Sequence, residues 1–217
     1  MILSIEKRGP VIQYVIPENC DDRILDLALN HLSNGELIII PSDTNWIVVG
    51  DIRYKKAVEK IYRLKKQDKL KHFSLLCCSL KMANQVALIS SQVFRSMKRK
   101  VPGHFTFILP AQKSITKSLK ASKADQQVGL RIIPINWINK LIEKNGGPLI
   151  STHIDQQFLG IPDEEDIYSY LIEERLSHEV ALTIDSGESE FAGISTIINF
   201  ANEDEDVLTR QGVGIWP

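Results

Sequence analysis

The sequence predicts an α/β fold: a twisted sheet of mixed parallel and antiparallel strands, flanked by helices. Two observations lead to this prediction. Short apolar runs of strand length alternate with amphipathic runs of helical spacing over most of the chain. Near the C-terminus, three further strand-length runs follow one another, separated by hairpin-length loops rather than helices. The first pattern is typical of parallel strands and the second of antiparallel ones, so the sheet is expected to contain both.

Turn and capping residues bound the predicted elements. Acidic residues at Asp21-Asp22 and the pair Asn34-Gly35 frame a first helix, and the buried strand 37–40 follows it. The other predicted helices are 55–65, 92–100, 136–145 and an acidic one at 163–176. The other predicted strands are 73–78, 105–109, 127–133, 149–152, 180–184, 195–200 and 207–210.

Composition predicts one domain over residues 1–217. The hydrophobic and charged fractions, 43% and 24%, are those of an ordinary globular protein, and no repeat or Pro/Ser-rich linker divides the chain. No apolar run approaches the roughly 18 residues of a membrane helix, and the first residues show no secretion signal. A cytoplasmic protein without membrane contact is therefore expected. The three cysteines, Cys20 and the adjacent Cys77 and Cys78, match no disulfide or metal pattern and are expected to be reduced core thiols.

Charge is divided along the chain, although the net charge is only −1. Residues 53–100 contain 14 Lys and Arg against 2 Asp and Glu, whereas residues 153–217 contain 2 against 15. Two interpretations remain open. The segments are either two solvated faces of opposite sign, or a basic wall that attracts phosphate or RNA, opposed by an acidic flank.

A candidate binding site begins where the first predicted strand ends, at Pro41-Ser42-Asp43-Thr44. Open α/β sheets place ligands at the carboxyl ends of their strands. The chain has no phosphate-binding loop, and its single G-x-G lies at the extreme C-terminus with no helix after it. A nucleotide-like anion would therefore be bound by cations such as Lys65 and Arg131, with hydroxyls such as Thr106 and Ser195 donating hydrogen bonds.

Seven segments carry a family resemblance by their order and spacing. They are Pro41-Ser42-Asp43-Thr44, Leu64-Lys65-Lys66-Gln67, His72-Phe73-Ser74-Leu75, the run from Pro102 to Leu109, Gly129-Leu130-Arg131-Ile132, Ser195-Thr196-Ile197-Ile198 and the run from Leu208 to Gly212. They resemble the P-T-D-T, I-K-x-R, H-P-L, P-G-x-F-T-F-I-L, G-x-R-x-P, S-T-V-V and L-R-x-G elements of the YrdC/YciO family. The resemblance covers approximately residues 20–215.

The resemblance implies a YrdC-like fold and the activity of an L-threonylcarbamoyladenylate synthase. Such an enzyme joins threonine, bicarbonate and ATP, with magnesium, releases pyrophosphate, and supplies a product used to modify adenosine in tRNA. No tightly bound cofactor, catalytic side chain or metal ligand is assigned. The implied substrate-binding residues are Ser42, Thr44, His72, Arg131, Thr152 and Ser195, and the implied nucleotide-binding residues are Lys65, Thr106 and Arg210.

Three of these assignments have open alternatives. Arg131 would bind a carboxylate bidentately, but it could instead pair with an internal acid. Ser42 could merely end a strand. Lys65 could be a solvated residue at a helix end.

The chain departs from the synthase pattern at the phosphate end. Where the family has K-x-R, the chain reads Lys65-Lys66-Gln67, and where it has S-x-N, the chain reads His153-Ile154-Asp155. The amide of Gln67 lacks the guanidinium charge, and Asp155 would repel a phosphate. Trp46 replaces the aromatic residue that follows P-T-D-T and is expected to reshape the pocket. In these departures, and in the segment from Lys71 to Cys77, the chain resembles the YciO-type branch of the family.

His153 and Asp155 also permit a metal interpretation, because side chains two apart on a strand share one face. A changed polar contact is the simpler interpretation. Two functions are thus carried forward. The first is a synthase-like enzyme with an altered ATP site, and the alternative is a double-stranded RNA or tRNA binding protein whose basic segment 53–100 contacts phosphates.

Overall fold

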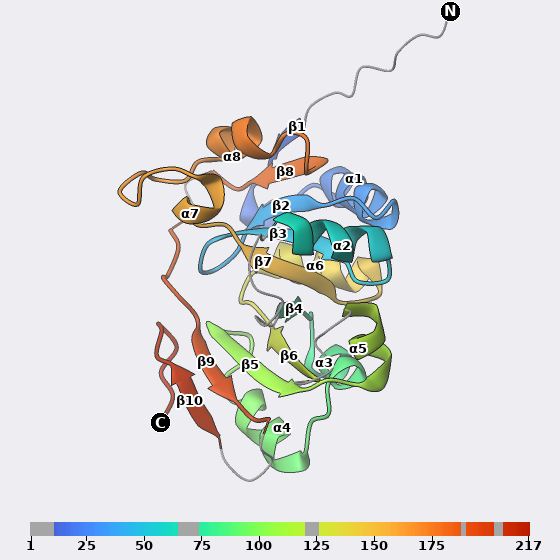
Figure 1. Ribbon diagram of the computed structural model, residues 1–217, viewed down its shortest axis with the longest axis vertical. Coiled ribbons are helices and arrows are strands. Elements are labelled where there is room, and N and C mark those ends of the chain that lie inside the picture. The colour runs from blue at the N-terminus through green and yellow to red at the C-terminus, as the bar shows by residue number, and fades with distance from the viewer. Residues whose placement is uncertain (1–10, 65–73, 120–125, 188–189, 202–205) are drawn as a thin grey trace, which may run out of the picture.

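Ten strands form one sheet in the computed structural model, which describes residues 11–64, 74–119, 126–187, 190–201 and 206–217 (Figure 1). The strand order is β1-β8-β2-β3-β7-β4-β6-β5-β9-β10. The strands are β1 Val11–Tyr14, β2 Ile38–Pro41, β3 Trp46–Asp51, β4 Ser74–Leu76, β5 Phe105–Pro110, β6 Gln127–Arg131, β7 Leu149–His153, β8 Leu182–Asp185, β9 Thr196–Asn199 and β10 Val207–Arg210.

The sheet mixes both strand directions, so the predicted α/β class with a mixed sheet is confirmed. The parallel pairs are β1 with β8, β8 with β2, β4 with β6, and β5 with β9. The antiparallel pairs are β2 with β3, β3 with β7, β7 with β4, β6 with β5, and β9 with β10.

Helices cover both faces of the sheet, and side chains that alternate along the strands fill a core under each. In β2, Ile38 and Ile40 face one core and Ile39 the other, as the two-residue period of a strand requires. The helices are η1 Pro17–Asn19, α1 Asp22–Ser33, α2 Lys55–Leu64, α3 Leu80–Val86, α4 Ser91–Lys98, α5 Lys113–Leu119, α6 Asn136–Asn145, α7 Gln156–Leu159 and α8 Ser169–Leu176. Buried residues of α1 and α6 belong to the first core, and those of α2, α3 and α4 to the second.

The helix boundaries that the sequence signals most clearly are confirmed. The Asp21 carboxylate accepts a hydrogen bond from Arg23 N at 2.8 Å and caps α1, and Gly35 follows that helix with φ of +66°. Gly146, with φ of +70°, ends α6 in the left-handed conformation that glycine adopts without steric cost.

The acidic segment 163–176 is a helix only from Ser169 onward, so the first half of that prediction is wrong. Glu165 N donates to Pro162 O at 3.1 Å in a turn, and residues 163–166 are exposed. Four consecutive charged residues offer no apolar side chain to pack on the core, which is what stabilises most helices in proteins. Strands β1 and β3 and helices α3, α5 and α7 were not expected from the sequence.

The last strands do not follow one another as hairpins. Strand β8 lies between β1 and β2, whereas β9 lies between β5 and β10, so their connection crosses most of the sheet. In Figure 1 this orange-red connection descends along the left side. Ten extended residues can span about 33 Å, so a short connection does not by itself require neighbouring strands. Of the last three strands, β9 and β10 pair in the antiparallel direction that was expected.

The cysteine prediction holds in part. All three cysteines are free thiols; Cys77 is buried, whereas Cys20 and Cys78 are half-buried. Burial raises the pKa of the Cys77 thiol to about 12. Separately, no helix within the described ranges has both the length and the apolar character that crossing a bilayer requires.

Candidate functional site

A pocket of about 470 Å³, here called the central pocket, opens in the middle of the sheet. Strands β3 to β7, β9 and β10 all contribute side chains to it. Six of the nine predicted site residues line it, namely Thr44, Thr106, Arg131, Thr152, Ser195 and Arg210. Segments that lie far apart in the sequence therefore meet at one place, as the resemblance implied.

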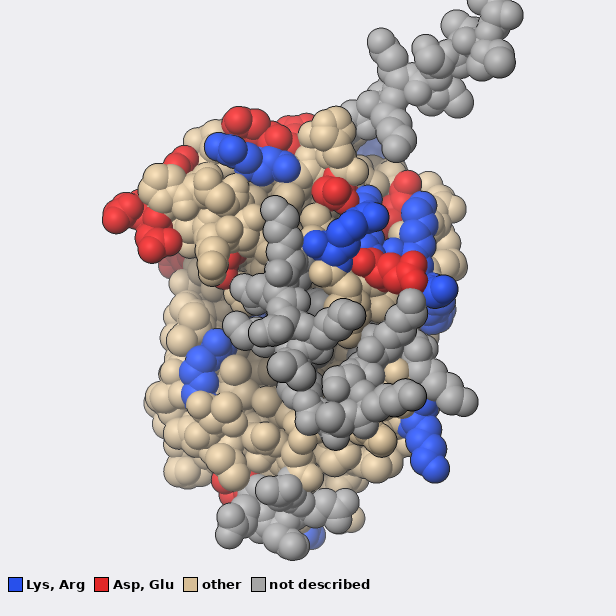
Figure 2. All heavy atoms as spheres, viewed as in Figure 1, with Lys and Arg blue, Asp and Glu red and all other residues tan. Residues whose placement is uncertain are grey.

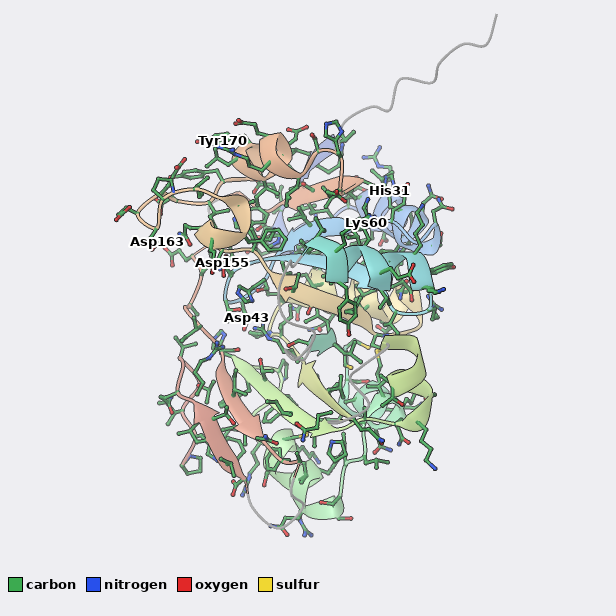
Figure 3. The ribbon with its side chains drawn as sticks, in the orientation of Figure 1. His31, Asp43, Lys60, Asp155, Asp163 and Tyr170 are labelled. Carbon is green, nitrogen blue, oxygen red and sulfur yellow. The ribbon has the colours of Figure 1, made fainter. Side chains whose placement is uncertain are left out.

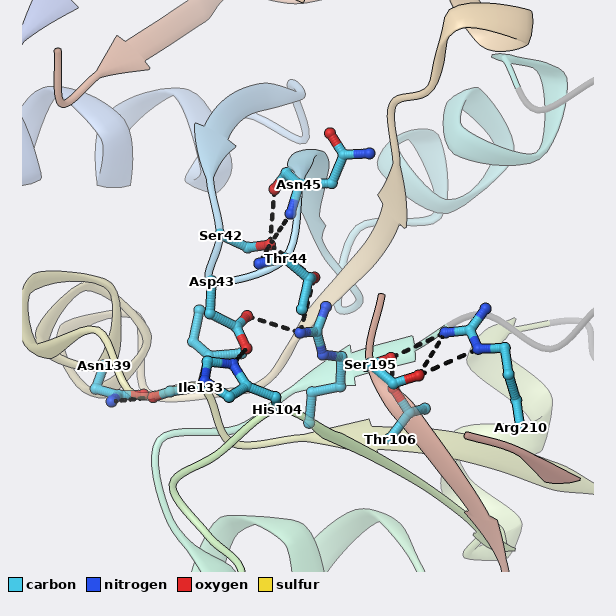
Figure 4. A network of polar contacts seen from close by, with 11 residues as sticks. Ser42, Asp43, Thr44, Asn45, His104, Thr106, Ile133, Asn139, Ser195 and Arg210 are labelled. Carbon is cyan, nitrogen blue, oxygen red and sulfur yellow. Dashed lines mark hydrogen bonds and ion pairs between the residues drawn. The ribbon is translucent and has the colours of Figure 1, made fainter. Parts of the chain in front are cut away.

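Of the other three predicted site residues, Ser42 is described and does not line the pocket. Lys65 and His72 lie outside the described residues, as does Gln67. Ser42 is buried, but its hydroxyl is used inside the turn. It donates to Asn45 O at 2.7 Å and lies 3.2 Å from the Thr44 and Asn45 amides (Figure 4). Ser42 therefore stabilises the turn that contains Thr44. This agrees with the alternative interpretation, in which Ser42 ends a strand and does not bind a ligand.

Arg131 is held by an internal acid at the edge of the pocket. Its Nη2 donates to Asp43 Oδ1 at 2.7 Å and to Thr44 Oγ1 at 3.1 Å, and His104 Nδ1 lies 2.8 Å from Asp43 Oδ2 (Figure 4). Burial lowers the pKa of the Arg131 guanidinium, while the Asp43 charge opposes that shift. The alternative of an internal ion pair is thus correct, and Arg131 also lines the pocket.

Arg210 provides a second cation on the opposite side of the pocket. Its Nη2 donates to Ser195 O at 2.8 Å and to Ser195 Oγ at 3.1 Å, and Ser195 Oγ lies 2.9 Å from Thr106 Oγ1. After burial, the charge of Arg210 also lowers the pKa of Arg131, so the two guanidinium groups lie close enough to interact across the pocket. Two like charges that face one space favour an anion between them.

Two buried polar atoms at the pocket have no partner among the described residues, namely Arg131 Nε and Thr152 Oγ1. More than nine-tenths of each residue is buried. Buried polar groups are nearly always hydrogen-bonded, and leaving one unpaired costs about 1–3 kcal/mol. The pocket therefore keeps a guanidinium donor and a hydroxyl available for a ligand.

His153 and Asp155 form a local structure rather than a metal site. Asp155 Oδ1 accepts from Phe158 N at 2.7 Å and caps α7, and its Oδ2 lies 3.0 Å from His153 Nε2. His153 lines the central pocket, and Asp155 does not. In the ranges that the structure describes, no three His, Cys, Asp or Glu side chains gather in a way that could bind a metal.

Trp46 does not reshape the central pocket, so that expectation is wrong. Its indole Nε1 donates to Ile167 O at 3.0 Å, and its ring lies 6.1 Å from that of Phe191. Successive residues of a strand point to opposite faces, and Ile47 is the residue that faces the central pocket. The Trp46 side chain lines a neighbouring cavity instead.

The fold and the site define a class, an α/β protein with a cation-lined pocket in the middle of a mixed sheet. A family model named Sua5/YciO/YrdC, with the description "Telomere recombination", matches residues 30–212. The chain belongs to this family. The resemblance drawn from the seven segments is thereby confirmed.

The relatives include proteins of two kinds. YciO of Escherichia coli is 30% identical over 207 residues, which cover 93% of this chain and 95% of that protein. Its crystal structure matches with a TM-score of 0.80 at 28% identity, over 95% of this chain and 97% of that one. A threonylcarbamoyl-AMP synthase of Saccharophagus degradans is 26% identical over 156 residues, 71% of this chain and 81% of the synthase.

A second solved structure supports the fold alone. The crystal structure of P. abyssi Sua5 complexed with L-threonine matches with a TM-score of 0.79 at 22% identity. The match covers 93% of this chain and 57% of that one.

Proposed function

We propose that the chain is a threonylcarbamoyl-AMP synthase-like protein of the YciO type, whose central pocket binds L-threonine and whose ATP end is altered. The observation that carries this proposal is the convergence of six polar residues on one pocket that retains two unpaired buried donors. The names of the S. degradans synthase and of the Sua5–threonine complex support the choice of substrate.

The amino acid is assigned to the Arg131 side of the pocket. Arg131 Nε and Thr152 Oγ1 are the unpaired donors, so they bind a carboxylate. Thr44 already accepts from Arg131 and offers its hydroxyl from the turn. The Asp43 carboxylate fixes the guanidinium from behind, which limits the conformational freedom lost when a ligand binds.

The nucleotide is assigned to the Arg210 side. In the proposed reaction the threonine amine condenses with bicarbonate to form a carbamate and water. A carbamate oxygen then attacks the α-phosphorus of ATP, forming the acyl-adenylate and releasing pyrophosphate. Arg210, with the Ser195 and Thr106 hydroxyls beside it, would stabilise phosphate charge. The described residues offer no metal-binding cluster, so no step is assigned to protein-bound magnesium.

Weaker binding of ATP than in a full synthase follows from the altered phosphate end. Where the family has serine and asparagine, His153 and Asp155 bind one another, and Asp155 also caps α7. The Asp155 carboxylate therefore does not donate to a phosphate as an asparagine amide would, and one ring nitrogen of His153 is engaged by Asp155. We propose ATP, L-threonine and bicarbonate as the ligands of this site, with tRNA as the user of the product.

The test combines a reaction with a titration. The chain is incubated with ATP, L-threonine, bicarbonate and magnesium, and threonylcarbamoyl-AMP is measured by mass spectrometry. Calorimetric titration with L-threonine is run in parallel on the wild type and on Arg131→Met. Threonine binding that Arg131→Met abolishes supports the substrate assignment. The absence of both the adduct and threonine binding would sink the proposal.

The RNA-binding alternative gains no support from the described part of the basic segment. Arg53 forms an ion pair with Asp51, and Lys60 and Arg63 lie 3.9 and 3.8 Å from Glu179. Cations that already face carboxylates contribute less to phosphate binding, because the carboxylates repel the phosphate.

A further inference from the structure

A second cavity, of about 690 Å³, lies on the other side of the turn that contains Thr44 and Asn45. It is also lined by the starts of β3 and α7, by the segment before α8 and the start of that helix, and by the end of β8 with the residues after it. Here it is called the acidic cavity, because the charged side chains that line it within the described ranges are Asp166, Asp185 and Glu190. It shares Thr44 and Asn45 with the central pocket but has the opposite charge.

Aromatic rings form much of its wall. Tyr168 and Tyr170 stack with centroids 5.6 Å apart and planes 9° from parallel, and both are more than half exposed. Trp46 and Phe191 meet edge to face on the inner side at 6.1 Å. The face of an aromatic ring carries negative potential and attracts ammonium and guanidinium groups. The exposure of two stacked tyrosines leaves such a face available to a ligand.

The buried carboxylate of Asp185 is an independent sign of a cationic ligand. Asp185 is 7% exposed and lines the cavity, and its Oδ1 accepts one hydrogen bond, from Gly187 N at 2.8 Å. No Lys, Arg or His is among the described residues that line this cavity. Buried carboxylates are normally paired with a cation, and the part of the chain that the structure describes supplies none to Asp185 at this cavity.

We infer that the acidic cavity binds a small organic cation bearing an ammonium or guanidinium group. The charge would lie near Asp185, with Asp166 and Glu190 at the rim, and the apolar stem would lie against the tyrosine rings. Acidic side chains gather over the loop between α7 and α8, and Tyr170 lies on that side of the molecule (Figures 2 and 3). The acidic flank noted in the sequence thereby gains a specific role.

The test is a calorimetric titration with two probes, spermidine and Nα-acetyl-L-arginine amide, at physiological salt. The test variant is Asp166→Asn with Glu190→Gln, which removes two lining charges. The control is Asp163→Asn with Glu164→Gln, which removes the same number of charges from exposed residues that belong to the loop containing Asp166 but do not line the cavity. The test variant is expected to bind about tenfold more weakly, while the control changes less than about twofold.

A second variant tests the aromatic wall. Tyr168→Leu with Tyr170→Leu keeps apolar bulk and removes the ring faces, so about fivefold weaker binding of the cation is expected. L-Threonine binding at the central pocket serves as the folding control and is expected to be unchanged. The inference is overturned if the wild type binds neither probe at millimolar concentration. Equal losses in the test and control charge variants would also overturn it, since they would show general attraction to an acidic surface.

Discussion

Two threonine hydroxyls, in Thr152 and Thr183, allow ligand binding to be separated from folding. Both are buried without a partner among the described residues, but only Thr152 lines the central pocket. Thr183 is fully buried in β8. A valine at either position keeps the branched shape and removes the hydroxyl. An unpaired buried hydroxyl costs about 1–3 kcal/mol. The free energy of unfolding of each variant is therefore expected to be about 1 kcal/mol higher than that of the wild type.

The ligand responds to only one of the two variants. If Thr152 Oγ1 bonds a bound carboxylate, removing it costs about 1.5–3 kcal/mol, which weakens L-threonine binding by roughly tenfold to a hundredfold. Thr183→Val is expected to leave the affinity unchanged. Urea denaturation gives the stabilities and calorimetry the affinities. Unchanged threonine binding in Thr152→Val would refute the assignment of this hydroxyl, and a loss of stability in Thr152→Val alone would show that the hydroxyl has a partner in the unliganded protein.

Three further predictions concern stability. Asp43→Asn removes the carboxylate from the buried Arg131 pair and is expected to lower the free energy of unfolding by about 3–5 kcal/mol in urea; a loss below about 1 kcal/mol would contradict the pairing. Gly50→Ala places a Cβ 2.7 Å from Leu37 Cδ2 and is expected to cost about 1–3 kcal/mol, measured by thermal denaturation; an unchanged midpoint would contradict the close packing. Burial raises the pKa of Cys77 from 9.0 to about 12, so between these pH values the folded state keeps a proton that the unfolded state loses. The free energy of unfolding is therefore expected to fall in this range by up to about 1.4 kcal/mol per pH unit. In Cys77→Ala this fall with pH is expected to be smaller.

The predictable parts of the fold are those decided by neighbouring residues. Helices α1, α2 and α6 follow from apolar spacing and from end signals such as Asp21 and Gly146, which act within one turn. The neighbours of β8 and β9 depend on contacts with strands far away in the sequence. A prediction from loop length alone therefore assigned the wrong neighbours to β8 and β9, and no local sequence pattern indicates the correct ones.

The site shows the same division. The convergence of Thr44, Arg131 and Ser195 was predicted through the family resemblance, which contains information on distant contacts that spacing lacks. The role of Trp46 was mispredicted, because a one-residue step along β3 decides which cavity a side chain faces. The capping role of Asp155 depends on where β7 gives way to α7, and element boundaries are the least certain part of a sequence-based prediction.

The position of β8 sets the order in which the chain can complete its structure. Residues 182–185 lie between the strand at 11–14 and the strand at 38–41, so one side of β2 has no partner until most of the chain has left the ribosome. The uncovered strand contains Ile38-Ile39-Ile40, and an unpaired apolar edge of this kind recruits other chains. A nascent or truncated chain that ends before β8 is therefore expected to aggregate, and protection of that edge during synthesis becomes a requirement of this topology.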